Sequence, residues 1–199
     1  MRGALRWGWL VVGLVACGDE GRGPGRPPPA GMPWLADQYA VEVTLLESDC
    51  FPGGFDPVAL PAVATVWQDG ARVEWSQETE SADGDFWYLT GALCPRDDGY
   101  VLRLAGGRRN TVEGCQVRST LPAEPVDAKA DPCTTDGYME LLFEDDGCGS
   151  LRPATESVRA RLMYSRACAA RSNCDMVMSL RAVPTVRDVR APEAPRFCR

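Results

Sequence analysis

The chain has 199 residues, with 28 acidic and 21 basic side chains and a net charge of −7. Because a negative surface repels the phosphates of nucleic acids, this composition argues against nucleic acid as a partner. The chain contains no histidine, which excludes Ser-His and Cys-His nucleophile pairs and histidine-ligated metals. The S-x-x-K, G-x-S-x-G, G-x-x-x-x-G-K and G-x-G-x-x-G patterns are also absent, so we expect neither enzyme activity nor a cofactor.

Residues 1–16 have the features of a secretory signal peptide. Arg2 and Arg6 supply a cationic start, and an apolar run follows from Trp7 to Val15. The run is much shorter than the roughly 20 apolar residues of a membrane-spanning helix. We therefore expect residues 1–16 to be an export signal that is removed, and not a permanent anchor.

The signal peptide ends in Leu14-Val15-Ala16-Cys17, which resembles the lipobox of bacterial lipoproteins. The resemblance implies cleavage before Cys17, with acyl chains on its sulfur and on the new amino group. Each buried methylene contributes about 0.8 kcal/mol, so several acyl chains would hold the protein on a bilayer. The expected location is the cell envelope, on the exported side of a bacterial membrane; the outer membrane is favoured over the inner membrane, and the sequence does not decide between them. The alternative is an ordinary signal peptide that happens to end at a cysteine.

Residues 17–33 are expected to form the lipid anchor and a tether. The stretch from Gly18 to Pro33 holds five glycines and five prolines and has few apolar side chains to bury. Proline-rich segments extend by about 3.1 Å per residue, which would place the following domain roughly 30 to 50 Å from the bilayer. We expect a single folded domain from Trp34, with an irregular C-terminal tail from about residue 187.

The domain is predicted to be all-β, because short runs rich in Val, Tyr, Trp and Thr alternate with Gly, Pro and Asp. About eight or nine antiparallel strands fit an up-and-down barrel or a two-sheet sandwich, and the sequential hairpins favour the barrel. Two long connections are expected, over 119–137 and 145–156. The predicted strands are 39–46, 62–67, 72–77, 86–93, 100–104, 111–118, 138–144, 157–164 and 175–182.

The clearest hairpin runs from Ala62 to Gln77, with Asp69-Gly70 as its expected two-residue turn. This turn predicts that Val66 lies opposite Val73 and that Ala64 lies opposite Trp75. These four side chains then share one face of the hairpin, which we expect to be the core face. Trp67 and Arg72 fall on the other face.

Eight cysteines remain if Cys17 is acylated, and an even number in an exported chain predicts disulfides. We expect four bridges, and the sequence does not determine their pairing. One local pairing, between Cys168 and Cys174, would close a short loop between two predicted strands. Zinc held by cysteines is the alternative, but no C-x-x-C pair is present. The eight cysteines are Cys50, Cys94, Cys115, Cys133, Cys148, Cys168, Cys174 and Cys198.

Acidic clusters occur at 83–85, 97–99 and 144–147, each containing a glycine. They supply the oxygen ligands that calcium prefers, but none has the spacing of a calcium loop, and Asp and Gly are ordinary turn residues. We therefore expect no metal site. The sequence from Thr135 to Gly137 reads Thr-Asp-Gly, which reverses the order of an aspartic protease motif. A hydrolase that uses two carboxylates stays a remote alternative.

Four aromatic residues are candidates for lining a ligand site, although each is also a reasonable core residue: Trp67, Trp87, Tyr88 and Tyr164. The function that the sequence favours is a non-catalytic binding or interaction module, held at a membrane through acylated Cys17. Its partner would be a small ligand or an envelope protein. The alternative is a structural or assembly factor of the envelope that has no ligand pocket.

Overall fold

The computed structural model describes residues 25–50, 59–79, 86–112, 115–165, 168 and 172–186. These residues form ten β-strands and no helix, which confirms the all-β prediction. The strands are β1 (Gln38–Ser48), β2 (Ala59–Asp69), β3 (Arg72–Thr79), β4 (Phe86–Arg96), β5 (Gly99–Val112), β6 (Cys115–Leu121), β7 (Met139–Glu144), β8 (Ser150–Pro153), β9 (Val158–Tyr164) and β10 (Cys174–Val186). The C-terminal tail expected from about residue 187 lies outside the described residues.

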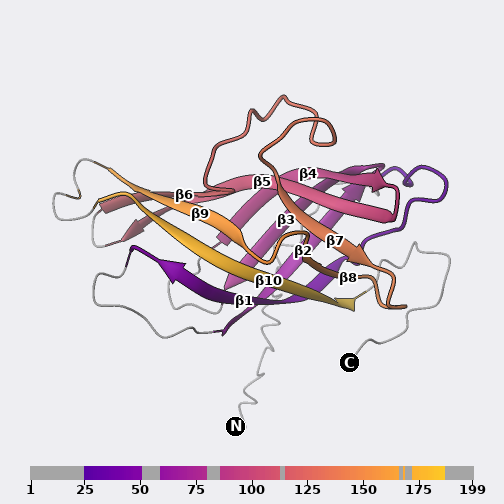
Figure 1. The fold of residues 1–199 in the computed structure, drawn as a ribbon, viewed down its shortest axis with the longest axis horizontal. Coiled ribbons are helices and arrows are strands. Elements are labelled where there is room, and N and C mark those ends of the chain that lie inside the picture. Colours follow the sequence, from indigo (N-terminus) through magenta and orange to yellow (C-terminus); the bar gives the residue numbers. More distant parts are fainter. Residues whose placement is uncertain are drawn as a thin grey trace, which may run out of the picture.

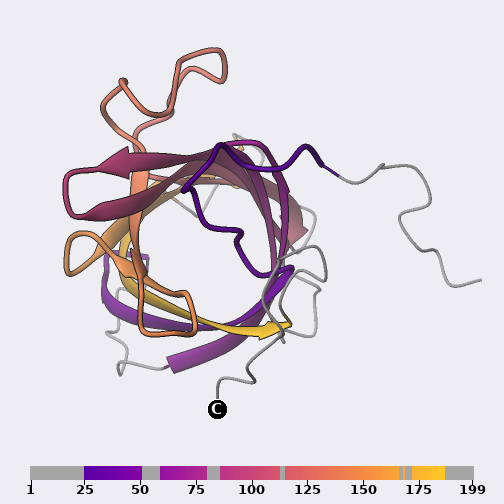
Figure 2. The same cartoon turned by 90° about the vertical axis from the view of Figure 1, so that its right-hand side faces the viewer.

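The strands close into a barrel and not into a sandwich (Figures 1 and 2). Every pairing is antiparallel, and the ring runs β1-β2-β3-β4-β5-β6-β9-β10, with β10 pairing back to β1. The ring therefore has eight strands, and the sequence prediction that favoured the barrel is confirmed. We call the end where β1 begins, together with the β2–β3 and β4–β5 turns, the near end of the barrel. The opposite end is the far end.

β5 and β10 each change neighbours along their length, and this explains why ten strands fit an eight-stranded ring. Towards the far end, β5 pairs with β6 and β10 pairs with β9. Towards the near end, β5 pairs with β7 and β10 pairs with β8. Two strand pairs thus fill the space between β5 and β10: β6–β9 towards the far end and β7–β8 towards the near end. Gly106 and Gly107 lie where β5 changes partner, and a Cβ at either position would collide with a neighbouring strand's carbonyl oxygen.

The barrel interior is filled by side chains from alternate positions of the strands. Along β4 and β5, four of the inward positions hold leucines that are at most 1% exposed: Leu89, Leu93, Leu102 and Leu104. Trp75 and Tyr39 stack inside the barrel, with ring centroids 5.7 Å apart. The largest side chains that are almost completely buried are Trp75, Tyr39, Leu89, Leu93, Leu102, Leu104, Met139, Leu141 and Leu151.

The β2–β3 hairpin forms where the sequence predicts it, but its register differs. Asp69 pairs with Arg72, so the turn residues are Gly70 and Ala71, and Val66 lies opposite Trp75 instead of Val73. Gly70 has φ +65°, which suits the first turn position of a type II′ hairpin. The observed register differs from the predicted one by two residues, and side chains alternate between faces with a period of two. The predicted core face of the hairpin is therefore correct, and only the predicted cross-strand pairs were wrong.

Two other strand predictions were wrong. The predicted strand 111–118 spans the end of β5 and the start of β6, because β5 continues to Val112. β8, a strand of only four residues, lies within the connection expected over 145–156. Its Ser150 and Leu151 are buried, but four residues are too few to show an alternating pattern in the sequence.

The segment before β1 crosses the near end of the barrel, as the indigo chain in Figure 2 shows. Leu35 is 2% exposed, and its N–H donates a 2.9 Å hydrogen bond to the buried side chain of Gln68. Arg26 forms an ion pair with Asp69, and the hydroxyl of Tyr100 donates to the carbonyl of Gly31 at 2.8 Å. From Gly25 onwards, the segment assigned to the tether is therefore in contact with the barrel.

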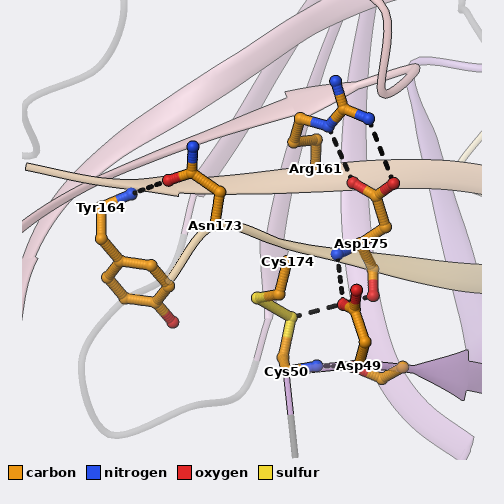
Figure 3. Close-up of a disulfide and its surroundings, with 8 residues drawn as sticks. Asp49, Cys50, Arg161, Tyr164, Asn173, Cys174 and Asp175 are labelled. Atoms are coloured by element: carbon orange, nitrogen blue, oxygen red, sulfur yellow. Dashed lines mark hydrogen bonds and ion pairs between the residues drawn. A yellow bond between two sulfur atoms is a disulfide. The ribbon is translucent and has the colours of Figure 1, made fainter. Parts of the chain in front are cut away.

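Three disulfides join described cysteines, with Cα–Cα distances of 5.1 to 5.5 Å. Two of them lie at the far end: Cys50–Cys174 joins the end of β1 to the start of β10, and Cys115–Cys168 joins β6 to the segment after β9. Figure 3 shows Cys50–Cys174 with its surroundings. The third bridge, Cys94–Cys133, holds the long connection between β6 and β7 to the outside of β4.

The predicted Cys168–Cys174 bridge was wrong. After β9 the chain turns towards β6, because the N–H of Ser165 donates a 2.9 Å hydrogen bond to the carbonyl of Gln116. This places Cys168 beside Cys115, while Cys174 stays in the β9–β10 ladder opposite Leu162. Cys148 is also disulfide-bonded.

Candidate functional site

The four aromatic residues that the sequence singles out do not meet at one site. Trp87 faces the barrel interior, 8% exposed, and the guanidinium of Arg108 lies 5.4 Å from the centre of its ring. Tyr164 is half-buried at the far end, at the end of β9 (Figure 3). Trp67 and Tyr88 lie on the outer face, and Tyr88 lines a groove there that does not include Trp67. These four side chains therefore do not form a common pocket inside the barrel.

The acidic turn at 144–147 has structural partners. The carboxylate of Asp146 accepts hydrogen bonds from the N–H groups of Cys148 and Gly149, both at 2.8 Å, and from the hydroxyl of Ser150 at 2.6 Å. Burial acts to raise the pKa of Asp146, but these hydrogen bonds outweigh it and lower the pKa. The carboxylate thus stabilises the β7–β8 turn. Residues 83–85 lie outside the described residues.

The described residues also contain one group with metal-ligand geometry, made of Asp49, Cys50 and Cys174. The two sulfurs of this group are joined in a disulfide, so they do not serve as thiolate ligands. The nearby carboxylate of Asp49 accepts a 2.5 Å hydrogen bond from the N–H of Asp175, which joins β10 to the end of β1 (Figure 3).

A groove of about 760 Å³ lies on the outside of the barrel, between residues 122–138 and the outer face of β3 to β6. We call residues 122–138 the outer loop; it projects from the barrel wall at the top of Figure 1. The Cys94–Cys133 bridge fixes the outer loop to β4. The volume falls within the roughly 300 to 1,000 Å³ of small-molecule sites in proteins.

Arg103 of β5 is the second attachment of the outer loop. Its side chain is only 11% exposed and forms a 2.9 Å ion pair with Glu140 at the start of β7. The same guanidinium donates a 2.5 Å hydrogen bond to the carbonyl of Pro132 and lies over the ring of Tyr138. One cation therefore contacts the loop at two points, and together with the disulfide it holds the roof of the groove in place.

The floor of the groove consists of rows of outward-facing residues, in the order set by the strand registers. Ala92 pairs with Arg103 in the row nearest the disulfide, and Thr90 pairs with Ala105 one row further along. In the next row Gly107 lies between Tyr88 and Thr120, so its lack of a side chain leaves the groove deep there. The hydroxyl of Tyr88 donates a 2.6 Å hydrogen bond to Glu74. The row after that contains a pair of arginines.

Arg109 of β5 and Arg118 of β6 lie directly opposite each other at the exposed end of the groove. Both side chains line the groove, and neither makes an ion pair or a hydrogen bond with another residue in the part of the chain that the structure describes. Other arginines nearby are paired. Arg72 contacts Glu74 at 3.4 Å, and Arg161 forms two hydrogen bonds with Asp175.

Sequence reasoning missed this groove. The high arginine content looks like a compositional bias, and nothing in the sequence shows that residues 109 and 118 are cross-strand partners, because the predicted strand 111–118 hides the β5–β6 turn. The available signal was the alternation in β6, where Arg118 is exposed between the buried residues Val117 and Ser119. If the sequence had been divided into two strands between residues 112 and 115, Arg109 and Arg118 would have been predicted as cross-strand partners.

The structure thus defines an eight-stranded antiparallel barrel with an arginine-lined groove on its wall. Comparisons with protein-family models, with curated proteins and with solved structures find no match to this chain. Among the described residues, no helix has the length and the apolar character needed to cross a membrane. The chemistry of the groove is therefore the main guide to function.

Proposed function

We propose that this protein is a lipoprotein of a bacterial cell envelope whose barrel is a non-catalytic binding module, with the groove under the outer loop as its binding face. The observation that carries the binding role is a groove of ligand size whose roof is fixed by a disulfide and by Arg103. A roof held in place reduces the ordering cost of binding. The lipobox ending at Cys17 supports the anchor.

The near end is where the chain enters the barrel, whereas the groove lies on the side wall. An acyl anchor before residue 25 would therefore attach the barrel by its near end and leave the groove open to the envelope space. The closed ring gives no free strand edge among the eight strands that form it, which disfavours the alternative of an assembly factor that adds a strand from a partner.

The carboxyl groups whose pKa the fold clearly shifts do not support a two-carboxylate hydrolase. The pKa values of Asp69, Asp146 and Asp175 all lie below their ordinary range, because hydrogen bonds and nearby arginines favour the charged form. A general acid needs a raised pKa. We therefore favour binding over hydrolysis.

Photo-crosslinking in intact cells tests the binding face. A benzophenone amino acid is placed at Ala128, which is exposed on the outer loop and lines the groove, and at Ala40, which is exposed on β1 elsewhere on the barrel. We expect a defined adduct from position 128 and none from position 40. Equal adducts from both positions, or none from position 128, contradict the proposal.

The anchor has an independent test in the cysteine pairing. Cys148 is disulfide-bonded, and the six other described cysteines pair among themselves, so only Cys17 and Cys198 are available as its partner. An acylated Cys17 has no thiol, and we therefore expect a Cys148–Cys198 bridge and acyl mass on a mature chain that begins at Cys17. A Cys148–Cys17 bridge refutes the anchor.

A further inference from the structure

Two unpaired arginines at one end of the groove point to the chemistry of its ligand. Arg109 and Arg118 face each other across the β5–β6 ladder, and like charges in directly opposite positions destabilise a sheet. The chain contains 28 acidic side chains, yet within the described residues neither arginine pairs with one. An anion between the two guanidiniums would relieve the repulsion and form charge-assisted hydrogen bonds with both.

The opposite end of the groove has a different character. At and beneath the outer loop it is lined by small apolar side chains and prolines, namely Ala92, Ala105, Pro122, Pro125, Val126 and Pro132. Two carboxylates of the outer loop also line the groove, and both have partners: Glu124 lies 3.8 Å from Arg161, and Asp127 accepts a 3.0 Å hydrogen bond from the N–H of Lys129. From Ala105 to Arg109 the β5 strand rises about 13 Å, at roughly 3.3 Å per residue. The arginine pair is therefore separated from the apolar side chain of Ala105 by about the length of a small organic molecule.

We propose that the groove binds a small organic anion. Its apolar body lies between the outer loop and Ala105, and its phosphate or carboxylate head lies between Arg109 and Arg118. This assignment rests on the proposed function, because it names the ligand class of the same groove. The shared chemistry is an acidic head group on an apolar body, and the two head groups are distinguished by experiment.

The net charge of the protein makes this proposal specific. A chain of net charge −7 repels anions at long range, so affinity for an anion requires a local cluster of cations. Arg109 and Arg118 are such a cluster, and guanidinium groups match the geometry of phosphate and carboxylate oxygens. A larger acidic partner would not use the apolar end, which the outer loop covers.

Isothermal titration calorimetry on the full mature chain in phosphatidylcholine nanodiscs tests the proposal, with empty nanodiscs as the blank. The probes are 1-naphthyl phosphate, 1-naphthoate and the neutral 1-naphthamide, which share an aromatic body and differ in the head group. We expect one or both anions to bind and the amide to bind at least about tenfold more weakly, because it lacks a charge-assisted hydrogen bond. The stronger of the two anions identifies the head group.

Substitutions locate the site. R109Q and R118Q are each expected to weaken binding of the preferred anion by about tenfold or more, and higher salt to weaken binding to the unmodified chain. R96Q is the matched control, because Arg96 is an exposed arginine whose removal changes the net charge equally but leaves the groove intact.

Three results overturn the assignment: no anion binding up to about 1 mM, equal binding of the amide, or equal losses in R96Q, R109Q and R118Q. The crosslinking at Ala128 separates this failure from failure of the proposed function. Adducts at position 128 without anion binding mean that the groove binds another class of ligand, so the binding role stands and the anion assignment falls.

Discussion

The two faces of the β4–β5 sheet are both covered, yet only one of them is filled. On the inner face, Leu89, Leu102 and Leu104 are at most 1% exposed and pack against the opposite side of the barrel. On the outer face, Thr90, Ala105 and Gly107 lie under the outer loop, and a groove remains between them and the loop. The same pair of strands thus contributes large side chains to a filled core on its inner face. On its outer face the side chains under the loop are small, and a groove remains.

Removing a large inner side chain should have the largest effect. Leu104 is fully buried, and L104A is expected to lower the free energy of unfolding by about 2 to 5 kcal/mol, through lost burial and a new cavity. The matched outer change, T90A, is expected to cost less than about 1 kcal/mol. Urea denaturation of both variants measures the difference. Similar losses would mean that the outer face is packed as tightly as the core.

Releasing the outer loop should come next. The Cys94–Cys133 bridge closes a segment of 39 residues, and C94S/C133S is expected to cost about 2 to 4 kcal/mol. Limited proteolysis should then cut the outer loop, because only non-covalent contacts still hold it, chiefly those of Arg103 and the 3.8 Å ion pair between Glu124 and Arg161. The control is C50S/C174S, which removes a far-end bridge. Its outer loop should stay protected, and cleavage there in both variants would show that the bridge does not specifically hold the groove.

The inner face could be predicted from the sequence, and the groove could not. Alternation of Leu102 and Leu104 with more polar neighbours gives the strand and its buried side, since burial depends on period-two spacing alone. The groove depends on which strands are neighbours and on where a 17-residue loop folds back. The Cys94–Cys133 bridge fixes where the loop folds back, and the spacing of cysteines in a sequence does not determine how they pair.

The hairpin at Gly70 illustrates the same limit on a smaller scale. Asp69-Gly70 correctly marks a turn, but the register is set by contacts from a distant segment. The N–H of Gly70 donates to the carbonyl of Arg26, and the carboxylate of Asp69 binds the Arg26 side chain. Because those contacts come from residues more than 40 positions away, a local rule for turn residues gives the correct face and the wrong partners.

Acid should weaken the outer face selectively. Asp175 forms a bidentate pair with Arg161, at 2.8 and 3.2 Å, on the outside of β9 and β10 (Figure 3). Hydrogen bonding from Arg161 lowers the pKa of Asp175, against the opposing effect of burial. The pair therefore contributes stability above the unfolded-state pKa of about 3.9, and this contribution is lost as pH falls through the lower folded-state pKa.

The measurement is the free energy of unfolding between pH 6 and pH 2.5. We expect D175N to be less stable than the unmodified chain at pH 6, by about 1 kcal/mol or less, and the difference to shrink towards the acidic limit. D98N is a control on an exposed turn, where Asp98 is paired with Arg96 at only 3.8 Å. A gap between D175N and the unmodified chain that stays constant with pH would mean that Asp175 stabilises the barrel other than through its charge.

Reversing the charge of Arg118 should change stability least. It is still the sharpest test of the outer face, because stability should rise while anion binding is lost. R118E places a carboxylate opposite Arg109, which replaces a repulsive cross-strand pair with an attractive one. We expect the free energy of unfolding to rise by up to about 0.5 kcal/mol at low salt, with a smaller rise at high salt, while binding of the naphthyl anions is lost.

R96E is the matched control: it removes a weak attraction to Asp98, so its stability should fall slightly or stay level, and its anion binding should not change. A gain in stability coupled to loss of binding would show that the barrel tolerates an unfavourable charge pair where a ligand supplies the compensation, whereas a loss of stability in R118E would mean that Arg118 supports the fold itself.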